Sequence, residues 1–187
     1  MKEFFYMLKW KQHLDIQDVI SSLRNYNHLP HNLICPACSG KMVMHKDSSR
    51  KDSFRWVCKN CRKRRPIRIN TWSQKYRISL TRLYLLIRYY VEDYESYIAA
   101  SRVGLEHDSV LNIYNDLDCI KPRVVEKMIE EIENNISDSS IKDALIGSNF
   151  EFEDFSKIFP LSKVFELFLE ALIEKHELCK KGISSSL

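Results

Sequence analysis

Glycine and proline are scarce in this sequence, with 4 and 5 residues among 187. Their scarcity argues against long flexible linkers and against an all-β fold rich in tight turns. Hydrophobic residues make up 44% of the chain and charged residues 29%, which is typical of globular domains. A chain of this length allows one sizeable domain or two small ones.

Long apolar stretches are also missing. No run approaches the ~20 residues that a membrane-spanning helix needs. The apolar run before Lys9 has five residues, which is too short for the core of a signal peptide. We therefore expect an intracellular protein without a membrane association, whose six cysteines are thiols or metal ligands rather than disulfides.

Acidic residues are nearly absent from the first half of the chain. Residues 1–88 contain 19 lysines and arginines against 5 acidic residues, a net charge of +14. Residues 89–187 contain 10 against 20, a net charge of −10, so the overall +4 hides a strong asymmetry. The charge balance of the first half is typical of proteins that bind polyanions.

Four of the cysteines form a paired pattern, Cys35-x2-Cys38 and Cys58-x2-Cys61, with nineteen residues between the two pairs. Each C-x-x-C places two thiolates on one tight turn, at the separation that tetrahedral zinc requires with Zn–S distances of ~2.3 Å. The residues between the pairs would form a hairpin that returns the second turn to the first. The pattern predicts one structural Zn²⁺ ion, which supplies folding energy that so small a β element lacks.

Other interpretations of these cysteines are two disulfides, a redox C-x-x-C pair, or chance. Disulfides fit an intracellular protein poorly, and a redox pair is not normally duplicated. His31 and His45 lie near enough to be considered as ligands, but four cysteines already complete a site. Cys119 and Cys179 have no comparable partners, and we expect them to be buried as small hydrophobic residues.

A long basic segment surrounds the second cysteine pair. Residues 50–88 contain thirteen lysines and arginines and a single acid, Asp52. A charge run is usually a solvated face, but here one sign persists and aromatic residues are interleaved, which favours phosphate contacts. We expect Trp56 in the ribbon core, and Trp72 either in the core or stacked on a base. The predicted phosphate contacts are Arg62, Lys63, Arg64, Arg65, Arg68, Lys75 and Arg77.

Residues 96–115 fit a helix-turn-helix. Ala100 is the small residue that lets two helices approach, and Gly104 suits a left-handed turn. Val110 and Ile113 would anchor the second helix to the first. The predicted outward-facing DNA contacts are His107, Ser109, Asn112 and Asn115. The alternative is a helical hairpin that packs and contacts nothing.

Helical and strand periodicities complete the predicted fold, which is mainly α with a small β zinc ribbon. The predicted helices are 15–26, 80–91, 96–103, 108–119, 123–136 and 161–178, with Asp15 and Ser79 as N-caps of the first two. The predicted strands are 41–45, 54–57 and 66–69, with a hairpin loop at 47–52. The predicted parts are a helical segment (1–32), the zinc ribbon (33–72), the helix-turn-helix (76–120) and an acidic helical region (121–187).

The order of these features resembles the N-terminal region of Merlin-type transposases and their bacterial insertion-sequence relatives. The resemblance lies in NYNHLP before CPAC, then FRWVCKNCRKRRPIRINTW, then YIAASRVGLEHDSVLNIYNDL, and covers residues 15–119. It implies a zinc ribbon and helix-turn-helix that recognise terminal inverted repeats in double-stranded DNA. In that family a DDE nuclease domain of RNase H-like fold follows.

The resemblance ends where catalysis would begin. After Cys119 there are 68 residues, whereas a nuclease domain is expected to have on the order of 100 or more. A DDE site needs three carboxylates around two metal ions ~4 Å apart. Glu151, Glu153 and Asp154 resemble its first part only faintly and are better interpreted as an exposed acidic loop, so we predict no catalytic residues.

We therefore expect a nuclear, zinc-dependent DNA-binding protein derived from a transposase and lacking its catalytic domain. A homodimer through residues 124–136 and 161–173 is a further expectation, beside the simpler one that these helices pack within the chain. A protein-interaction module of a transcription or replication assembly is the alternative function. An active nuclease would need carboxylates from another chain.

Overall fold

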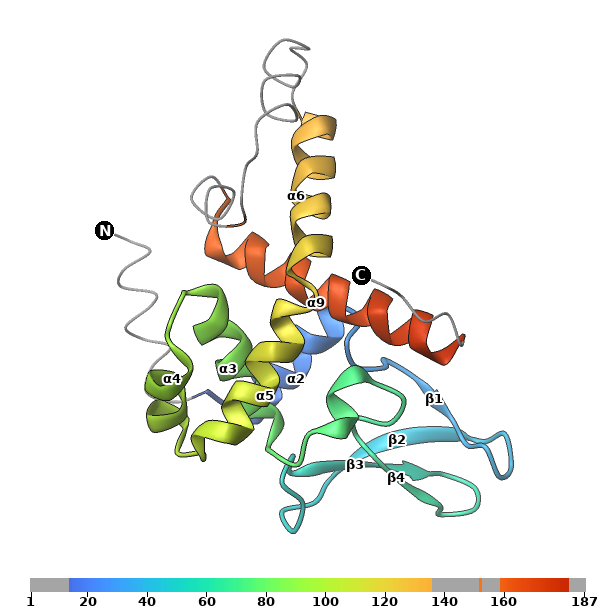
Figure 1. Ribbon diagram of the computed structural model, residues 1–187. Helices are drawn as coiled ribbons and strands as arrows, with labels where there is room; N and C mark the ends of the chain where they lie inside the picture. The colour runs from blue at the N-terminus through green and yellow to red at the C-terminus, as the bar shows by residue number, and fades with distance from the viewer. Residues whose placement is uncertain (1–13, 136–151, 153–158, 182–187) are drawn as a thin grey trace. The chain divides into compact units, whose positions relative to one another are not determined.

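The computed structural model describes residues 14–135, 152 and 159–181 (Figure 1). The chain divides into two compact units, residues 1–85 and 86–187, and the boundary falls within helix α3. The first unit contains α2 (Ile16–Asn25), β1 (Leu33–Ile34), β2 (Lys41–Lys46), β3 (Phe54–Cys58), β4 (Arg64–Pro66), the 3₁₀ helix η1 (Trp72–Lys75) and the start of α3 (Leu80–Val91). The second contains the rest of α3, α4 (Ser96–Val103), α5 (His107–Asp118), α6 (Lys121–Asn135) and α9 (Leu161–Lys180).

Strands β1 to β4 form one antiparallel sheet in sequence order (Figure 1). Met42 on β2 pairs with Cys58 on β3, and Val57 pairs with Arg64 on β4. Alternate residues of β3 are buried, and Trp56 is 2% exposed, as predicted for a residue of the ribbon core. Together with the helices, this sheet confirms the predicted fold class of a mainly α chain with a small cysteine-bearing β ribbon.

The last strand differs from the prediction, because β4 covers Arg64–Pro66 rather than residues 66–69. Pro66 lies opposite Arg55 and ends the ladder, since proline has no backbone N–H to donate to a further strand pair. The chain then turns, with the N–H of Ile69 donating to the carbonyl of Pro66 at 3.3 Å. Ile67 and Trp72 are consequently buried, at 1% and 7% exposure, which places Trp72 in the core rather than on a base-stacking surface.

The predicted helix caps are present. The carboxylate of Asp15 accepts a hydrogen bond from the N–H of Gln17 at 2.9 Å and caps α2. At α3 the hydroxyl of Ser79 accepts from the N–H of Arg82 at 3.3 Å. These local hydrogen bonds satisfy donors that a helix start leaves without partners.

Helices α4 and α5 pack against each other in the second unit (Figure 1). Gly104 ends α4 with a φ of 65°, the left-handed conformation predicted for it. Ala100, Val110 and Ile113 are buried at 4%, 0% and 1% exposure, so the small residue and the two anchors occupy their expected places. The residues between 96 and 118 therefore form a tight pair of short helices around an apolar contact.

Helices α6 and α9 also pack against each other. Lys127 lies 2.7 Å from the carboxylate of Glu174, and Arg123 pairs with the same residue at 2.8 Å. Seven apolar residues of α9, from Val164 to Leu172, are buried within this single chain, Phe168 and Leu172 completely. Within the described residues, no helix is both long and apolar enough to cross a membrane.

Cys119 and Cys179 are exposed, so the expectation that they are buried is wrong. Cys119 follows the last residue of α5, and Cys179 lies near the end of α9, where the helix faces solvent. The acidic residues Glu151, Glu153 and Asp154 lie outside the described residues.

Candidate metal centre and basic surface

The two cysteine turns have the same backbone structure. In the first, the N–H of Ser39 donates to the carbonyl of Cys35 at 2.9 Å, and the N–H of Cys35 donates to Gly40 at 2.9 Å. In the second, the N–H of Arg62 donates to Cys58 at 3.2 Å, and the N–H of Cys58 donates to Lys63 at 2.9 Å. The two turns thus match position by position, and each presents two thiols from one side.

Left-handed backbone conformations follow the second cysteine of each turn. Ser39 has a φ of 55° and Arg62 a φ of 61°, conformations that are strained for residues other than glycine. The same left-handed conformation at matching positions gives the two turns the same shape. A Cβ at Gly40 would lie 2.7 Å from the side-chain nitrogen of Asn60, so the two turns are in close contact.

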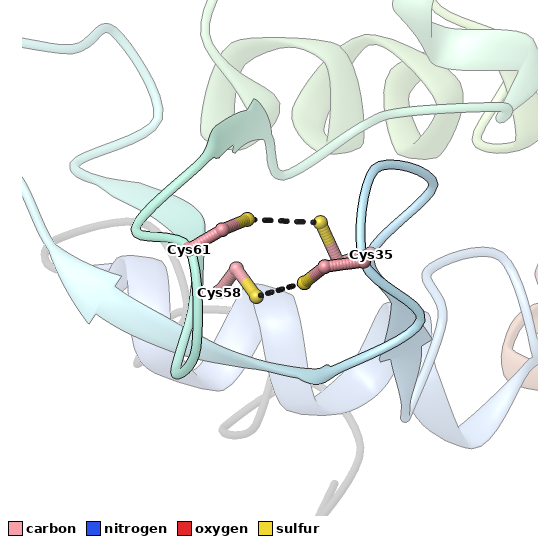
Figure 2. A group of neighbouring side chains, drawn as sticks. Cys35, Cys58 and Cys61 are labelled. Atoms are coloured by element: carbon pink, nitrogen blue, oxygen red, sulfur yellow. Dashed lines mark hydrogen bonds between the residues drawn. The ribbon is translucent and has the colours of Figure 1, made fainter.

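The four sulfur atoms converge between the turns (Figure 2). All lie within 4.8 Å of one another, and the short pairs cross from one turn to the other: Cys35 to Cys61 and Cys38 to Cys58, each at 3.5 Å. Four thiolates around a tetrahedral ion with Zn–S bonds of ~2.3 Å would be about 3.8 Å apart, so the cluster is close to the required size. The site can hold one metal ion.

The disulfide and redox alternatives find no support in this arrangement. None of the six cysteines, all of which lie in the described residues, forms a disulfide. The short sulfur contacts also cross between the two turns, which suits one shared ion better than two separate redox pairs. Among the nearby histidines, the imidazole Nε2 of His31 donates to the carbonyl of Arg24 at 2.8 Å.

Backbone N–H groups stabilise the thiolate of the first cysteine in each turn. The N–H groups of Cys61 and Asn60 lower the pKa of Cys58 to about 6, from an ordinary value of 9.0. The N–H of Ala37 lowers the pKa of Cys35 in the same way. At Cys61 the N–H of Lys63 lowers the pKa, but the thiols of Cys38 and Cys35 outweigh it and raise the pKa to about 12. Because thiolates are the metal-binding form, Cys35 and Cys58 are prepared for metal binding, whereas Cys61 has to lose its proton when the metal binds.

The predicted phosphate-contacting residues fall into two groups. Arg62, Lys63 and Arg64 are exposed directly beside the second cysteine turn, and Arg65 is half-buried. Lys75 and Arg77 are also exposed; the ammonium of Lys75 lies 5.0 Å from the ring centre of Tyr76, a cation–π contact. These residues remain accessible to a polyanion.

Arg68 is not accessible, and this removes it from the predicted phosphate contacts. It is 8% exposed, and its Nε lies 2.8 Å from the carboxylate of Asp52. Its remaining guanidinium nitrogens donate to the carbonyls of Ser73, Tyr76 and Ile78 at 3.1, 3.2 and 2.7 Å. The Arg68 side chain therefore stabilises the chain segment between β4 and α3.

Asp52 is the residue whose role the sequence did not reveal. Its second carboxylate oxygen accepts a hydrogen bond from the N–H of Leu80 at 2.9 Å, so Asp52 also caps α3. A signal was present, since Asp52 is the single acid among the thirteen basic residues of the segment 50–88. A lone acid in a basic segment is best interpreted as the partner of one of those cations.

On α5, the predicted DNA contacts Ser109, Asn112 and Asn115 are exposed together on the outer face. His107 is exposed as well, and its Nε2 lies 2.8 Å from the hydroxyl of Ser96 at the start of α4. The same helix exposes Asp108 and Asp118 and contains no lysine or arginine. Its outer face is therefore polar but not basic.

Comparison of the chain with protein-family models, with curated proteins and with solved structures finds no match. The class that the fold and site define is that of a small β ribbon, with a four-cysteine cluster that can hold a metal ion, joined to a helical region. The geometry of the cysteine cluster and the distribution of charge are therefore the features that indicate a function.

Proposed function

We propose that the protein binds double-stranded DNA through a zinc-stabilised ribbon, as a protein related to Merlin-type transposases. The observation that carries the proposal is the position of the exposed Arg62, Lys63 and Arg64 directly after the four-thiol cluster. A metal at the cluster would order the segment that presents these cations.

Zinc is the ion that suits the donor set best. Four thiolates form a soft, tetrahedral environment, which favours zinc or an iron–sulfur centre over oxygen-preferring ions such as magnesium. A complete set of four protein ligands leaves no open position for a substrate, so the ion would be structural. The nearby cations Arg62 and Lys63 would offset the net negative charge of a zinc tetrathiolate.

The two units would contribute differently to binding. Duplex DNA carries one negative charge per ~1.7 Å of its axis, so the basic ribbon unit would supply most of the affinity. The exposed Asn112 and Asn115 on α5 suit hydrogen bonds to adenine edges, and Ser109 suits either bases or phosphates. Because α5 has no positive side chain, it would contribute base reading rather than affinity. The expected target, paired terminal inverted repeats, follows from the resemblance to Merlin-type transposases.

The acidic residues of α5 favour a second candidate function, a protein-interaction module in a nuclear assembly. Asp108 and Asp118 on an exposed helix face oppose the approach of phosphates and suit a basic protein surface. Seven apolar residues of α9 are buried within the chain, which supports the simpler expectation that this helix packs on its own chain. A homodimer through α6 and α9 stays a proposal.

Fluorescence anisotropy with a labelled duplex of random sequence tests the proposal. We expect tight binding of the zinc-loaded chain at low salt, a steep loss of affinity as salt increases, and loss of binding after chelation. Cys58→Ser should abolish binding by disrupting the ribbon, whereas Cys179→Ser, at an exposed position outside the cluster, should bind normally. Absence of binding at low salt would contradict the proposal and favour the protein-interaction module.

A further inference from the structure

A groove with a volume of about 420 Å³ lies in the ribbon unit, between the β2–β3 hairpin loop and strand β4. Binding sites for small ligands commonly have volumes of about 300–1,000 Å³, so this groove has room for a group the size of one nucleotide. Five cationic side chains line it: Arg50, Lys51, Arg55, Arg64 and Arg65. We call it the hairpin–β4 groove.

The one acid in the groove lining is already neutralised. Asp52 forms an ion pair with the buried Arg68 at 2.8 Å and caps Leu80 at 2.9 Å, so both carboxylate oxygens have partners. Arg64, in contrast, has no ion pair or hydrogen bond from its side chain to any described residue. The groove therefore retains a net positive charge that is available to an anion.

Two guanidinium nitrogens of the groove lining lack acceptors. The Nε atoms of Arg55 and Arg65 are buried, and neither has a hydrogen-bond partner among the described residues. Asp47 pairs with the terminal nitrogen of Arg55 at 3.1 Å but does not satisfy its Nε. Buried donors nearly always have partners in folded proteins, so these two donors would gain an acceptor if the side chains moved to meet an oxyanion in the groove.

Apolar groups complete the lining. Phe54 and Ile67 are 8% and 1% exposed, and the ring of Pro66 is exposed at the end of β4. Cations beside a small apolar surface suit a ligand with an anionic and an apolar part, as in the phosphate and deoxyribose of a DNA strand. Arg62 and Lys63 extend the positive surface beyond the groove along the chain, which favours a polyanion over a single small anion.

We propose that the hairpin–β4 groove binds one nucleotide unit of a DNA strand, with the phosphodiester on Arg64 and Arg65 and the deoxyribose against Pro66. This inference rests on the proposed DNA-binding function and assigns a specific site to it. The site also includes Arg50, Lys51 and Arg55. The basic segment of the sequence did not single out these three residues as phosphate contacts.

The test compares two double variants with the same loss of charge in the full, zinc-loaded chain. Arg64→Gln with Arg65→Gln removes the groove contacts. Lys41→Gln with Lys46→Gln removes two exposed cations of β2 that do not line the groove. We expect the groove variant to lose about tenfold or more in duplex affinity and to reduce the salt slope by about 0.9, the value for the one phosphate contact that both arginines share. The β2 variant should lose only a few-fold; similar losses in both would overturn the inference.

Nuclear magnetic resonance of the arginine side chains tests nucleotide binding in the groove independently of duplex binding by the whole chain. The Nε–H signal of Arg65 should shift on addition of a thymidine dinucleotide with a single phosphodiester, and should not shift with the nucleoside thymidine. A shift with inorganic phosphate alone, equal to that with the dinucleotide, would reduce the groove to an anion site and overturn the nucleotide assignment.

The two proposals fail in different ways. Normal duplex binding by the groove variant, together with no shift of the Arg65 signal in the unaltered chain, would overturn the groove and leave the DNA-binding function standing. No duplex binding by the unaltered chain, with a clear shift at Arg65 on adding the dinucleotide, would overturn the function and keep the groove as a nucleotide site. Circular dichroism and the zinc content of each variant would establish that the ribbon is intact.

Discussion

The carboxylate of Asp52 lies 2.8 Å from the guanidinium Nε of Arg68, and the two residues are each 8% exposed. Asp52 is in the loop between β2 and β3, and Arg68 follows β4. Because Pro66 pairs with Arg55, both residues lie at the hairpin end of the sheet, and the ion pair joins the hairpin loop to the segment after β4. The same carboxylate caps α3 through Leu80. One pair of residues therefore links the ribbon to the first helix that follows it.

Arg68→Ala should destabilise the protein much more than Arg64→Ala. Removing Arg68 leaves a buried carboxylate without its charge partner and three carbonyls without donors, and loss of one member of a buried pair typically costs about 3–5 kcal/mol. Arg64 is exposed, and its replacement should change the free energy of unfolding by less than about 0.5 kcal/mol. Urea denaturation measures both. For the folded protein, Arg64→Ala should weaken DNA binding more than Arg68→Ala does. Equal losses of stability in the two variants would contradict the structural role of Arg68.

Ser39→Gly should stabilise the ribbon. Ser39 has a φ of 55°, and a left-handed conformation costs a non-glycine residue roughly 1–2 kcal/mol. Glycine relieves that strain but has more freedom in the unfolded chain, so a net gain of about 0.5–1 kcal/mol is expected. Thermal unfolding of the zinc-loaded protein measures it. Ser48→Gly, in an exposed loop at a residue without a positive φ, is the control and should give no gain.

Thiol reactivity should distinguish the cluster from the other cysteines. Cys119 and Cys179 are exposed and lie outside the cluster, so two thiols per chain should react rapidly with a disulfide reagent in the zinc-loaded protein. After chelation the four cluster thiols should become reactive as well. Elemental analysis should find one zinc per chain, and a visible absorption band would instead indicate iron. Rapid reaction of all the thiols before chelation would mean that the cluster holds no metal.

Tyr114→Phe should stabilise the second unit slightly. Burial raises the pKa of Tyr114, and its hydroxyl is buried without a hydrogen-bond partner among the described residues. Removing a buried polar group that lacks a partner avoids a desolvation penalty of about 1–3 kcal/mol, so a gain of up to that size is expected. The melting temperature measures the change. Tyr90→Phe is the matched control, because the hydroxyl of Tyr90 donates to Asp118 and its loss should be destabilising.

Local features of the sequence predicted the local structure well. The C-x-x-C spacing led to the cluster at Cys35, Cys38, Cys58 and Cys61, because such turns depend on a few adjacent residues. Helical periodicity and Gly104 predicted α4 and α5 for the same reason. The DNA-binding function and the family resemblance stay predictions, since a charge pattern indicates a class of partner but not a particular contact.

The sequence did not predict the burial of Arg68 or the groove, because both depend on residues that are distant in the sequence and meet only in the tertiary structure. Arg68 is one of several similar arginines in the sequence, and its burial depends on Asp52, sixteen residues earlier, and on carbonyls as far as Ile78. The groove likewise requires the hairpin loop and β4 to lie together, which no local pattern specifies. The sequence alone therefore determined which four cysteines form the cluster and where the basic residues are concentrated along the chain. Only the folded chain decided which cations remain exposed, because a buried arginine needs an acceptor for each of its donors.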